Sequence, residues 1–335
     1  MERVLFGRVI LGALALAGCT TSSAQEQFSE LSPELAELVA QPQTGSFNPD
    51  ARKDAEFFKD TPERFRPFVA VCNPWDEWDK PAPPFRIFGN SYYVGTCGIS
   101  SILVTSNEGH VLIDSGTEAG ADVVLANIRS LGFDLEDVEL LLTSHEHFDH
   151  VGGMAKVQEA TGGKVISSQT GIYVLVNGTD HPDDPQFGMH EPMQPITHGM
   201  PYNYANAPEL LERYGLTPHP TPGHTPGALS WSWQSCEGEV CRTIAYADSL
   251  SPVSADNYRF SDHPDYLADY FAGLERLGSV PCDILIAAHP SHSRLLKRMR
   301  VGELVEPGAC AYYAIGKVQD LEARLAKEAE QATSQ

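Results

Sequence analysis

Basic residues are scarce in this sequence. Its 335 residues include 45 aspartates and glutamates but 23 lysines and arginines, so the formal net charge at pH 7 is −22. No run of basic residues offsets this acidity. Nucleic acids and anionic lipid surfaces are also negatively charged, so the protein repels them and neither is an expected partner. The remaining composition, 42% hydrophobic and 20% charged, is that of a globular protein with a sizeable core.

Apolar runs long enough to span a bilayer are absent as well. The run at residues 9–17 is too short for that purpose, and Arg3 and Arg8 precede it, a pattern typical of a secretory signal. It ends in Leu-Ala-Gly-Cys, which resembles the lipobox of bacterial lipoproteins. We therefore expect a signal peptide at residues 1–18, a lipid on Cys19 as the only membrane attachment, and a periplasmic location. Ordinary cleavage near Ala24 is the alternative.

The sequence also lacks a C-x-x-C motif, which argues against a metal held by cysteines. If Cys19 carries a lipid, six of the seven cysteines remain: Cys72, Cys97, Cys236, Cys241, Cys282 and Cys310. An even number in an oxidising compartment indicates disulfides. Cys236 and Cys241 have a hairpin-like spacing, so we expect them to pair. The pairing of the other four stays open on spacing alone.

Strand-like and helix-like segments alternate through the chain. Short apolar runs at 101–105 and 110–114 flank Asn107-Glu108-Gly109, which predicts a hairpin. Helical spacing over 119–131 ends at Gly132, a residue that commonly ends a helix. Further strands are expected at 139–143, 164–167, 229–234, 243–247 and 283–288, and further helices at 153–161 and 312–332. Such alternation predicts a layered α/β domain.

The parts outside this alternation suggest the domain limits. Residues 19–70 are interpreted as an N-terminal tether and arm, with a short helix around 32–40, and residues 71–335 as the folded domain. Residues 72–90 are rich in proline and aromatic residues, which favours a packed irregular segment. Residues 176–207 are interpreted as loop.

One short segment concentrates side chains that bind metals. It follows the expected strand at 139–143 and contains His145, His147, Asp149 and His150. Strand ends often hold sites, because the backbone there is rigid and side chains emerge at an open edge. Imidazole and carboxylate groups are usual zinc ligands, and two histidines spaced by two in an extended segment point the same way. The segment therefore predicts two metal ions a few ångström apart.

Two histidines farther along the chain complete the predicted ligand set. His224 lies in a Pro- and Gly-rich turn at 221–227, and His289 follows the expected strand at 283–288. The first zinc would bind His145, His147 and His224, and the second Asp149, His150 and His289. Three protein ligands and an open position are typical of a catalytic zinc. His292 is the alternative to His289, and a metal-free histidine cluster is the alternative to the whole site.

The H-x-H-x-D-H pattern of residues 145–150 resembles the signature of the metallo-β-lactamase superfamily. That hexapeptide would also suit glyoxalases, lactonases or nucleases. Other segments are similar to the third subclass of class B β-lactamases, subclass B3, and the similarity covers most of residues 70–315. These segments are Tyr92–Thr96, Asp114–Gly116, Thr221–Gly227 with Ser230–Trp233, Ala245–Ser251 and Ala288–Pro290.

The resemblance implies an αββα sandwich with a dinuclear zinc site at one edge between two sheets. It implies hydrolysis of the β-lactam amide of penicillins, cephalosporins and carbapenems, with antibiotic resistance as the result, and a zinc site without a cysteine ligand. Separately from the resemblance, we expect the protein to be a monomer. A Cys282–Cys310 bridge is also implied, which leaves Cys72 with Cys97. Asp149 would hold the second zinc and orient the nucleophile.

The resemblance also suggests residues on the substrate side of the site. Ser249 and Ser251 match positions near the substrate carboxylate, although they are equally interpreted as ordinary strand-end serines. Gln186 and Phe187 lie in the loop that borders the pocket in this family. Trp75 is a candidate for the opposite wall, with a buried structural tryptophan as the alternative.

One position decides between activities on this fold. In several hydrolases of the superfamily an aspartate bridges the two metals, and Asp248 precedes Ser249 at the corresponding segment. An inward-facing Asp248 would indicate a lactonase or a phosphodiesterase. The Ser-Leu-Ser that follows matches the β-lactamase pattern, so we place Ser249 at the pocket and Asp248 in a supporting role. A non-catalytic zinc-binding envelope protein is a third interpretation, which the complete ligand set disfavours.

Overall fold

The computed structural model describes residues 58–333. The predicted signal peptide, Cys19 and the expected helix around 32–40 lie outside the described residues, as does most of the expected tether. Among the helices of residues 58–333, none is both long and apolar enough to cross a bilayer.

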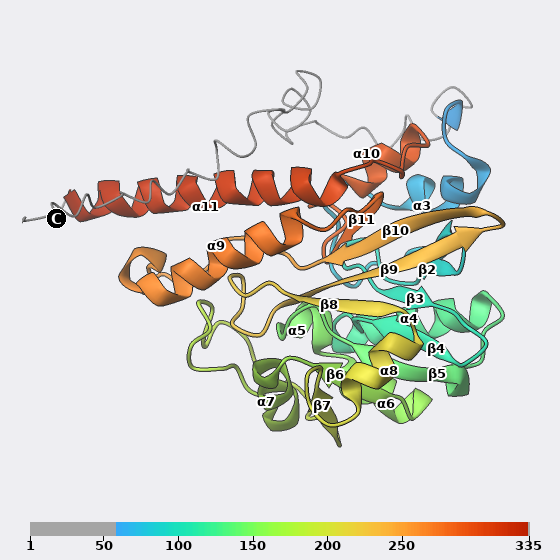
Figure 1. The fold of residues 1–335 in the computed structure, drawn as a ribbon, viewed down its shortest axis with the longest axis horizontal. Coiled ribbons are helices and arrows are strands. Elements are labelled where there is room, and N and C mark those ends of the chain that lie inside the picture. Colours follow the sequence, from blue (N-terminus) through green and yellow to red (C-terminus); the bar gives the residue numbers. More distant parts are fainter. Residues whose placement is uncertain (1–57, 334–335) are drawn as a thin grey trace, which may run out of the picture. The chain divides into compact units, whose positions relative to one another are not determined.

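Two β-sheets pack face to face in the described domain (Figure 1). The larger has the order β1-β2-β3-β4-β5-β6-β7, and the smaller has the order β11-β10-β9-β8. The strands of the larger sheet are β1 (Phe85–Phe88), β2 (Ser91–Tyr93), β3 (Ile102–Val104), β4 (His110–Ile113), β5 (Val138–Leu142), β6 (Lys164–Ser167) and β7 (Gly199–Pro201). Those of the smaller are β8 (Leu216–Pro220), β9 (Leu229–Glu237), β10 (Val240–Ala247) and β11 (Ile284–Ala287).

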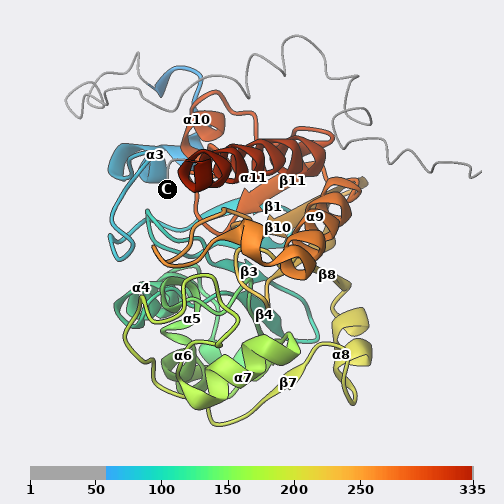
Figure 2. The same ribbon diagram turned by 90° about the vertical axis from the view of Figure 1, so that its left-hand side faces the viewer.

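Helices cover the outer face of each sheet (Figure 2). The larger sheet is covered by α4 (Glu118–Ser130), α6 (Met154–Thr161) and α7 (Gln169–Asn177), and the smaller by α9 (Pro264–Gly278) and α11 (Ala309–Thr333). Shorter helices are η3 (Glu63–Phe65), α3 (Arg66–Val71), η4 (Leu135–Asp137), α5 (Phe148–Val151), α8 (Ala207–Arg213), η5 (Phe260–Asp262) and α10 (Leu295–Arg300).

The alternation of side chains along the strands explains the four layers. In β4, Val111 and Ile113 face the core between the sheets, whereas Leu112 faces the helices. In β10, Tyr246 points into the inter-sheet core and Ala247 into the core under α9 and α11. Strands buried on both faces have continuous apolar sequences, which is why short apolar runs marked them. The αββα sandwich expected from the sequence is confirmed.

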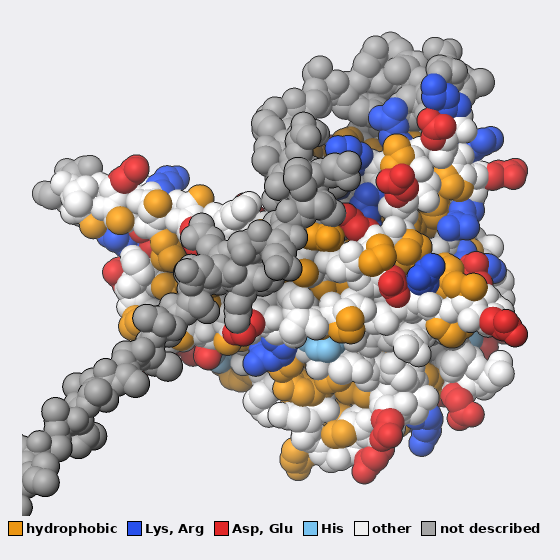
Figure 3. Space-filling model, turned by 45° about the horizontal axis from the view of Figure 1, so that its top comes forward, with side chains coloured by type: hydrophobic (Ala, Val, Ile, Leu, Met, Phe, Trp, Pro, Cys, Tyr) orange, Lys and Arg blue, Asp and Glu red, His pale blue; other side chains and the backbone are white. Residues whose placement is uncertain are grey.

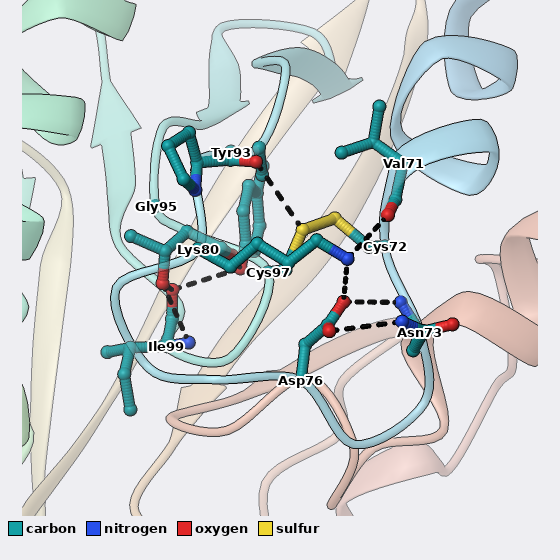
Figure 4. The surroundings of a disulfide bond; sticks show 12 residues. Val71, Cys72, Asn73, Asp76, Lys80, Tyr93, Gly95, Cys97 and Ile99 are labelled. Carbon is teal, nitrogen blue, oxygen red and sulfur yellow. Dashed lines mark hydrogen bonds and ion pairs between the residues drawn. A yellow bond between two sulfur atoms is a disulfide. The ribbon is translucent and has the colours of Figure 1, made fainter.

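Three disulfides lie within residues 58–333, and each joins a predicted pair. Cys236 and Cys241 lie opposite each other in the β9–β10 hairpin. The Cys72–Cys97 bridge joins the end of α3 to the loop after β2 (Figure 4). Next to it, Asp76 accepts hydrogen bonds from the backbone of Asn73 (2.6 Å) and from Lys80 (2.8 Å). This bridge therefore fixes a loop that reaches the metal centre described below.

The packed domain begins earlier than the sequence suggested. Residues 19–70 were expected to be an arm, yet Phe65, Phe68 and Val69 are buried in the inter-sheet core. Phe68 makes edge-to-face ring contacts with Phe85 and Tyr93, which extends the core beyond residue 71. The segment 176–207, interpreted as loop, also contains the end of α7 and all of β7.

Candidate metal centre

The six predicted ligands come from four places in the chain and meet at one edge of the sandwich. His145 and His147 follow β5, and Asp149 and His150 lie in α5. His224 lies in the turn after β8, and His289 follows β11. Backbone hydrogen bonds hold these loops together: Leu229 N donates to Ser144 O (2.6 Å), and Ser100 N donates to Ala288 O (2.9 Å).

His145, His147 and His224 form one triad. All three are buried, and one ring nitrogen from each lies within 4.8 Å of the others. The Nε2 of His145 is buried and has no hydrogen-bond partner among residues 58–333. An orphaned buried nitrogen is costly unless something binds it. This triad therefore has three donor nitrogens close together, one of them buried without a partner, as expected of a metal site.

Each ring of this triad is held through one nitrogen by a group behind it. These contacts are His145 Nδ1 to Asp248 Oδ1 (2.8 Å), His147 Nε2 to Asp184 Oδ2 (3.1 Å) and His224 Nδ1 to the carbonyl of Ser251 (2.8 Å). Such outer contacts orient a ligating histidine and leave its other nitrogen for the metal. The arrangement leaves Nε2 of His145, Nδ1 of His147 and Nε2 of His224 as ligand atoms.

Asp149, His150 and His289 form the second triad. Asp149 Oδ2 lies 3.1 Å from His150 Nε2 and 3.4 Å from His289 Nε2, and the two nitrogens lie 3.2 Å apart. Tetrahedral zinc with ligand bonds of about 2.0–2.1 Å needs ligand atoms about 3.3 Å from one another. The spacing of these three atoms thus fits a zinc ion without rearrangement.

The second triad has its own outer contacts. His289 Nδ1 donates to the carbonyl of Gly98 (3.2 Å), next to the disulfide-bonded Cys97. His150 Nδ1 lies 3.4 Å from Asp114 Oδ2. Asp114 has a positive φ of 62°, a backbone conformation that aspartate tolerates better than most residues. Its carboxylate also accepts from the backbone of Ser144 (2.6 Å), so it ties the β4 end to the ligand loop.

The ionisation of the ligands suits a cation. Burial, helped by the neighbouring histidines, holds the pKa of His145 and His224 well below the usual value, so both are neutral and able to bind metal at pH 7. Burial opposes the charge on His150, yet Asp149 and Asp114 raise its pKa to about 10. Asp149 and Asp114 therefore stabilise a positive charge at this place, and a bound metal ion can supply that charge.

Asp248 lies behind the first triad. Its side chain is fully buried, with Oδ1 next to His145 and Oδ2 accepting from Leu250 N (3.0 Å). Burial raises its pKa to about 7. The position matches the supporting role predicted for it, since it contacts the nitrogen of His145 that points away from the metal position.

The predicted substrate residues lie around this centre in different environments. Ser249 is fully buried, and its Oγ has no partner within the described chain. Ser251 is partly exposed and its hydroxyl donates to the carbonyl of Ser249 (3.2 Å). Leu250 between them has a φ of 46°, a strained conformation that separates the two serines. Gln186 is buried and Phe187 is exposed.

Sequence reasoning missed Asp184, which connects the loop of Gln186 to the metal centre. Besides contacting His147, Asp184 accepts from Gln186 N (2.7 Å) through Oδ1. It also missed Glu146, a fully buried carboxylate that accepts from Thr225 Oγ1 (2.7 Å) and Gly227 N (2.8 Å). Glu146 therefore fixes the turn that carries His224. Neither residue has a spacing that marks it, because its partners are distant in sequence.

A cavity of about 200 Å³ adjoins the second triad. Trp75, Trp78, His289 and His292 contribute to its wall. Trp75 is 60% exposed, which excludes the alternative of a buried structural tryptophan. The ring centroid of His292 lies 4.8 Å from that of His289, whereas His289 itself contacts Asp149 and His150. His289, and not His292, thus completes the second triad.

Comparisons with known proteins agree with this geometry. Residues 94–237 match the metallo-beta-lactamase superfamily. The MIM-2 metallo-beta-lactamase structure is 47% identical, with 80% of this chain and 99% of that chain covered and a TM-score of 0.72. MIM-1 from Novosphingobium pentaromativorans is 46% identical (79% and 98% covered, TM-score 0.73), and MEM-A1, a subclass B3 metallo-beta-lactamase from a soil metagenome library, is 37% identical (76% and 100% covered, TM-score 0.70).

Curated relatives match over shorter stretches. An uncharacterized Bacillus subtilis protein is 30% identical over 139 residues, 40% of this chain and 56% of that protein. The hydroxyacylglutathione hydrolase of Anaeromyxobacter dehalogenans is 27% identical over 199 residues, 58% of this chain and 62% of that enzyme. The chain thus spans less than two thirds of the length of these relatives. The solved structures, covered almost completely, place it more closely: the chain belongs to the metallo-β-lactamase superfamily, and its structural neighbours are the metallo-β-lactamases of subclass B3.

Proposed function

We propose that this protein is a zinc-dependent β-lactamase that binds two zinc ions. The observation that carries the proposal is the pair of adjacent triads, each with three converging donor atoms. Each of the five histidine rings also has a polar contact at its other nitrogen. His145, His147 and His224 would hold one ion, and Asp149, His150 and His289 the other. Nitrogen and carboxylate ligands without cysteine fit zinc in a hydrolytic site.

Zinc supplies activation of water at neutral pH and stabilisation of charge on the amide. The protein supplies position. Asp149 has one carboxylate oxygen among the second triad, where it would also orient the attacking water. The pKa of Asp149 is held well below its usual value, because His150 and His289 outweigh the opposing effect of burial. Asp149 is therefore anionic throughout the physiological range.

The substrate side of the site is formed by loops. Ser249 and Ser251 follow β10, and Gln186 and Phe187 lie in the loop tied to His147 through Asp184. The exposed ring of Phe187 offers an apolar surface to a substrate side chain. We propose that these residues contact the β-lactam, and that penicillins, cephalosporins and carbapenems are all substrates.

Biological context is part of the proposal. The N-terminal pattern supports export to the periplasm and attachment through a lipid on Cys19, and the three disulfides suit an oxidising compartment. There the enzyme would act as a monomer and confer resistance to β-lactam antibiotics.

A substrate panel tests the activity. The purified protein, loaded with zinc, is assayed with a penicillin, a cephalosporin, a carbapenem and a lactone ester, with and without a chelator. We expect opening of the β-lactams, loss of activity with the chelator, and recovery with added zinc. Hydrolysis of the lactone alone by the zinc-loaded protein would identify a lactonase and refute the proposal.

A further inference from the structure

The C-terminal helix α11 holds the segment that follows β10 at several points. Tyr313 Oη donates to the carbonyls of Asp248 (2.9 Å) and Ser249 (2.8 Å). Farther along the helix, Arg324 donates to Ser254 Oγ (2.7 Å), and Glu328 accepts from the backbone of residues 260 and 261 (3.1 and 2.9 Å). Figures 1 and 2 show α11 running beside α9 over the smaller sheet. The side chains of α11 near this segment are therefore in fixed positions.

Lys317 lies on the same face of α11, one turn after Tyr313. It is 8% exposed, and its Nζ lies 3.0 Å from Ser251 Oγ. Its carboxylate partner is Asp320, at 3.4 Å, and the side chain of Asp320 is 56% exposed. Its Nζ also lies 5.4 Å from the centroid of the Tyr313 ring. A buried ammonium with one solvent-exposed carboxylate at long distance is weakly compensated for its loss of water.

The hydrogen bonds around Ser251 leave one N–H group of the Lys317 ammonium without an acceptor. The hydroxyl of Ser251 accepts from Lys317 and donates to the carbonyl of Ser249, so its proton is already committed. An ammonium has three donors. Ser251 and Asp320 take two of those of Lys317, and no third acceptor is found in the part of the chain that the structure describes.

This ammonium lies beside the metal centre. Ser251, which it contacts, accepts through its carbonyl from Nδ1 of His224. In a chain of net charge −22, a cation at this place opposes the general repulsion of an anionic substrate.

We propose that Lys317 binds the carboxylate of the β-lactam substrate and makes the enzyme selective for anionic substrates. The proposal rests on the proposed β-lactamase function. Common β-lactam antibiotics bear a carboxylate next to the ring nitrogen, and a charge-assisted hydrogen bond from an ammonium suits that group. Ser251 then keeps Lys317 in place, and α11 becomes part of the substrate site.

Steady-state kinetics with a penicillin and its methyl ester test this assignment. In Lys317→Met, KM for the penicillin should rise about ten-fold or more, with kcat changed little, because the lost contact binds the ground state and the transition state alike. The ester, which lacks the negative charge, should be hydrolysed as by the wild type. Lys317→Arg keeps the charge and should retain the preference for the acid.

The control is Lys327→Met. Lys327 is exposed and lies on the same helix, about 15 Å along the axis, so its loss changes the net charge equally without touching the site. It should leave both substrates unaffected. Zinc content and thermal unfolding are measured for every variant. If Lys317→Met does not fold, Lys317→Gln, which keeps a hydrogen-bond donor without the charge, must show the same loss for the acid alone.

Two results overturn the assignment: an unchanged KM for the penicillin, or equal losses for the acid and the ester, which would indicate a purely structural lysine. Failure of the proposed function is a different result. In that case the zinc-loaded wild-type protein would open neither the penicillin nor its ester, and the comparison of variants would not be needed to see it.

Discussion

Replacing Asp248 with alanine removes the group that fixes His145. The carboxylate is buried, lies 2.8 Å from His145 Nδ1, and accepts from Leu250 N. Loss of such an outer partner typically lowers metal affinity about 10- to 100-fold. That range equals about 1.4–2.7 kcal/mol of zinc binding free energy. We therefore expect zinc to bind this much more weakly at the triad that contains His145, with the other triad nearly unchanged.

The substitution should also lower the free energy of unfolding of the metal-free protein. Leu250 N loses its acceptor in a buried turn, which costs about 1–3 kcal/mol. Asp248→Asn keeps an oxygen that can accept from His145, so its effect on zinc affinity should be smaller than that of alanine. The order wild type, asparagine, alanine is the signature of a positioning role.

Zinc titration of the metal-free protein against a competing chromophoric chelator, fitted to two sites, measures both affinities. Asp283→Asn is the control, because Asp283 also accepts from a backbone amide, that of Thr243 in the middle of β10. Loss of both zinc ions together in Asp248→Ala would show that Asp248 bridges the metals, and equal zinc affinity in all three proteins would show that it does not position His145.

The structure supports further predictions. Cys72→Ser/Cys97→Ser should lower the free energy of unfolding in urea by about 2–4 kcal/mol and weaken the second zinc site; unchanged zinc affinity would mean that the bridge does not position Gly98. Glu146→Ala should lower the free energy of unfolding by about 1–3 kcal/mol, because the buried donors Thr225 Oγ1 and Gly227 N lose their acceptor; an unchanged urea midpoint would contradict this. Asp76 has a lowered pKa because its lysine and asparagine partners outweigh burial. Its contribution to stability is present above the ordinary pKa of 3.8 and is lost as the pH falls through the lower folded-state value. Asp76→Asn should therefore destabilise the protein at pH 7 and progressively less as the pH falls below 3.8, which urea unfolding across that range checks.

The predictable part of the fold is the part whose residues carry their own periodicity. The strands β4, β5, β6 and β11 each contain a run of at least two adjacent buried apolar residues, so their positions followed from the chain. The edge strand β8 has the sequence Leu-Thr-Pro-His-Pro. Because proline disfavours β-strands, the sequence did not predict a strand there. Its pairing with β9 comes from the tertiary structure.

The candidate site divides in the same way. Four of its ligand-type residues lie within the six positions from His145 to His150, and the other two lie in turns beside recognisable motifs, so the sequence was enough to nominate them. The groups that orient them could not be found from spacing. Asp184 lies 37 residues from His147 in sequence, and Lys317 lies 66 from Ser251. Only the packing of the loops and of α11 brings these pairs together. Figure 3 shows one face of the molecule, where charged side chains are scattered among apolar and neutral ones and form no continuous patch of one charge.

The most direct test of the central claim is a zinc titration of the metal-free protein followed by its rate of β-lactam opening. A dinuclear zinc β-lactamase should show no hydrolysis without metal and a rate that rises until two zinc ions are bound per chain, and substitution of His145 or His289 by alanine should lower that stoichiometry. A protein that binds two zinc ions and still leaves every β-lactam intact would contradict the account.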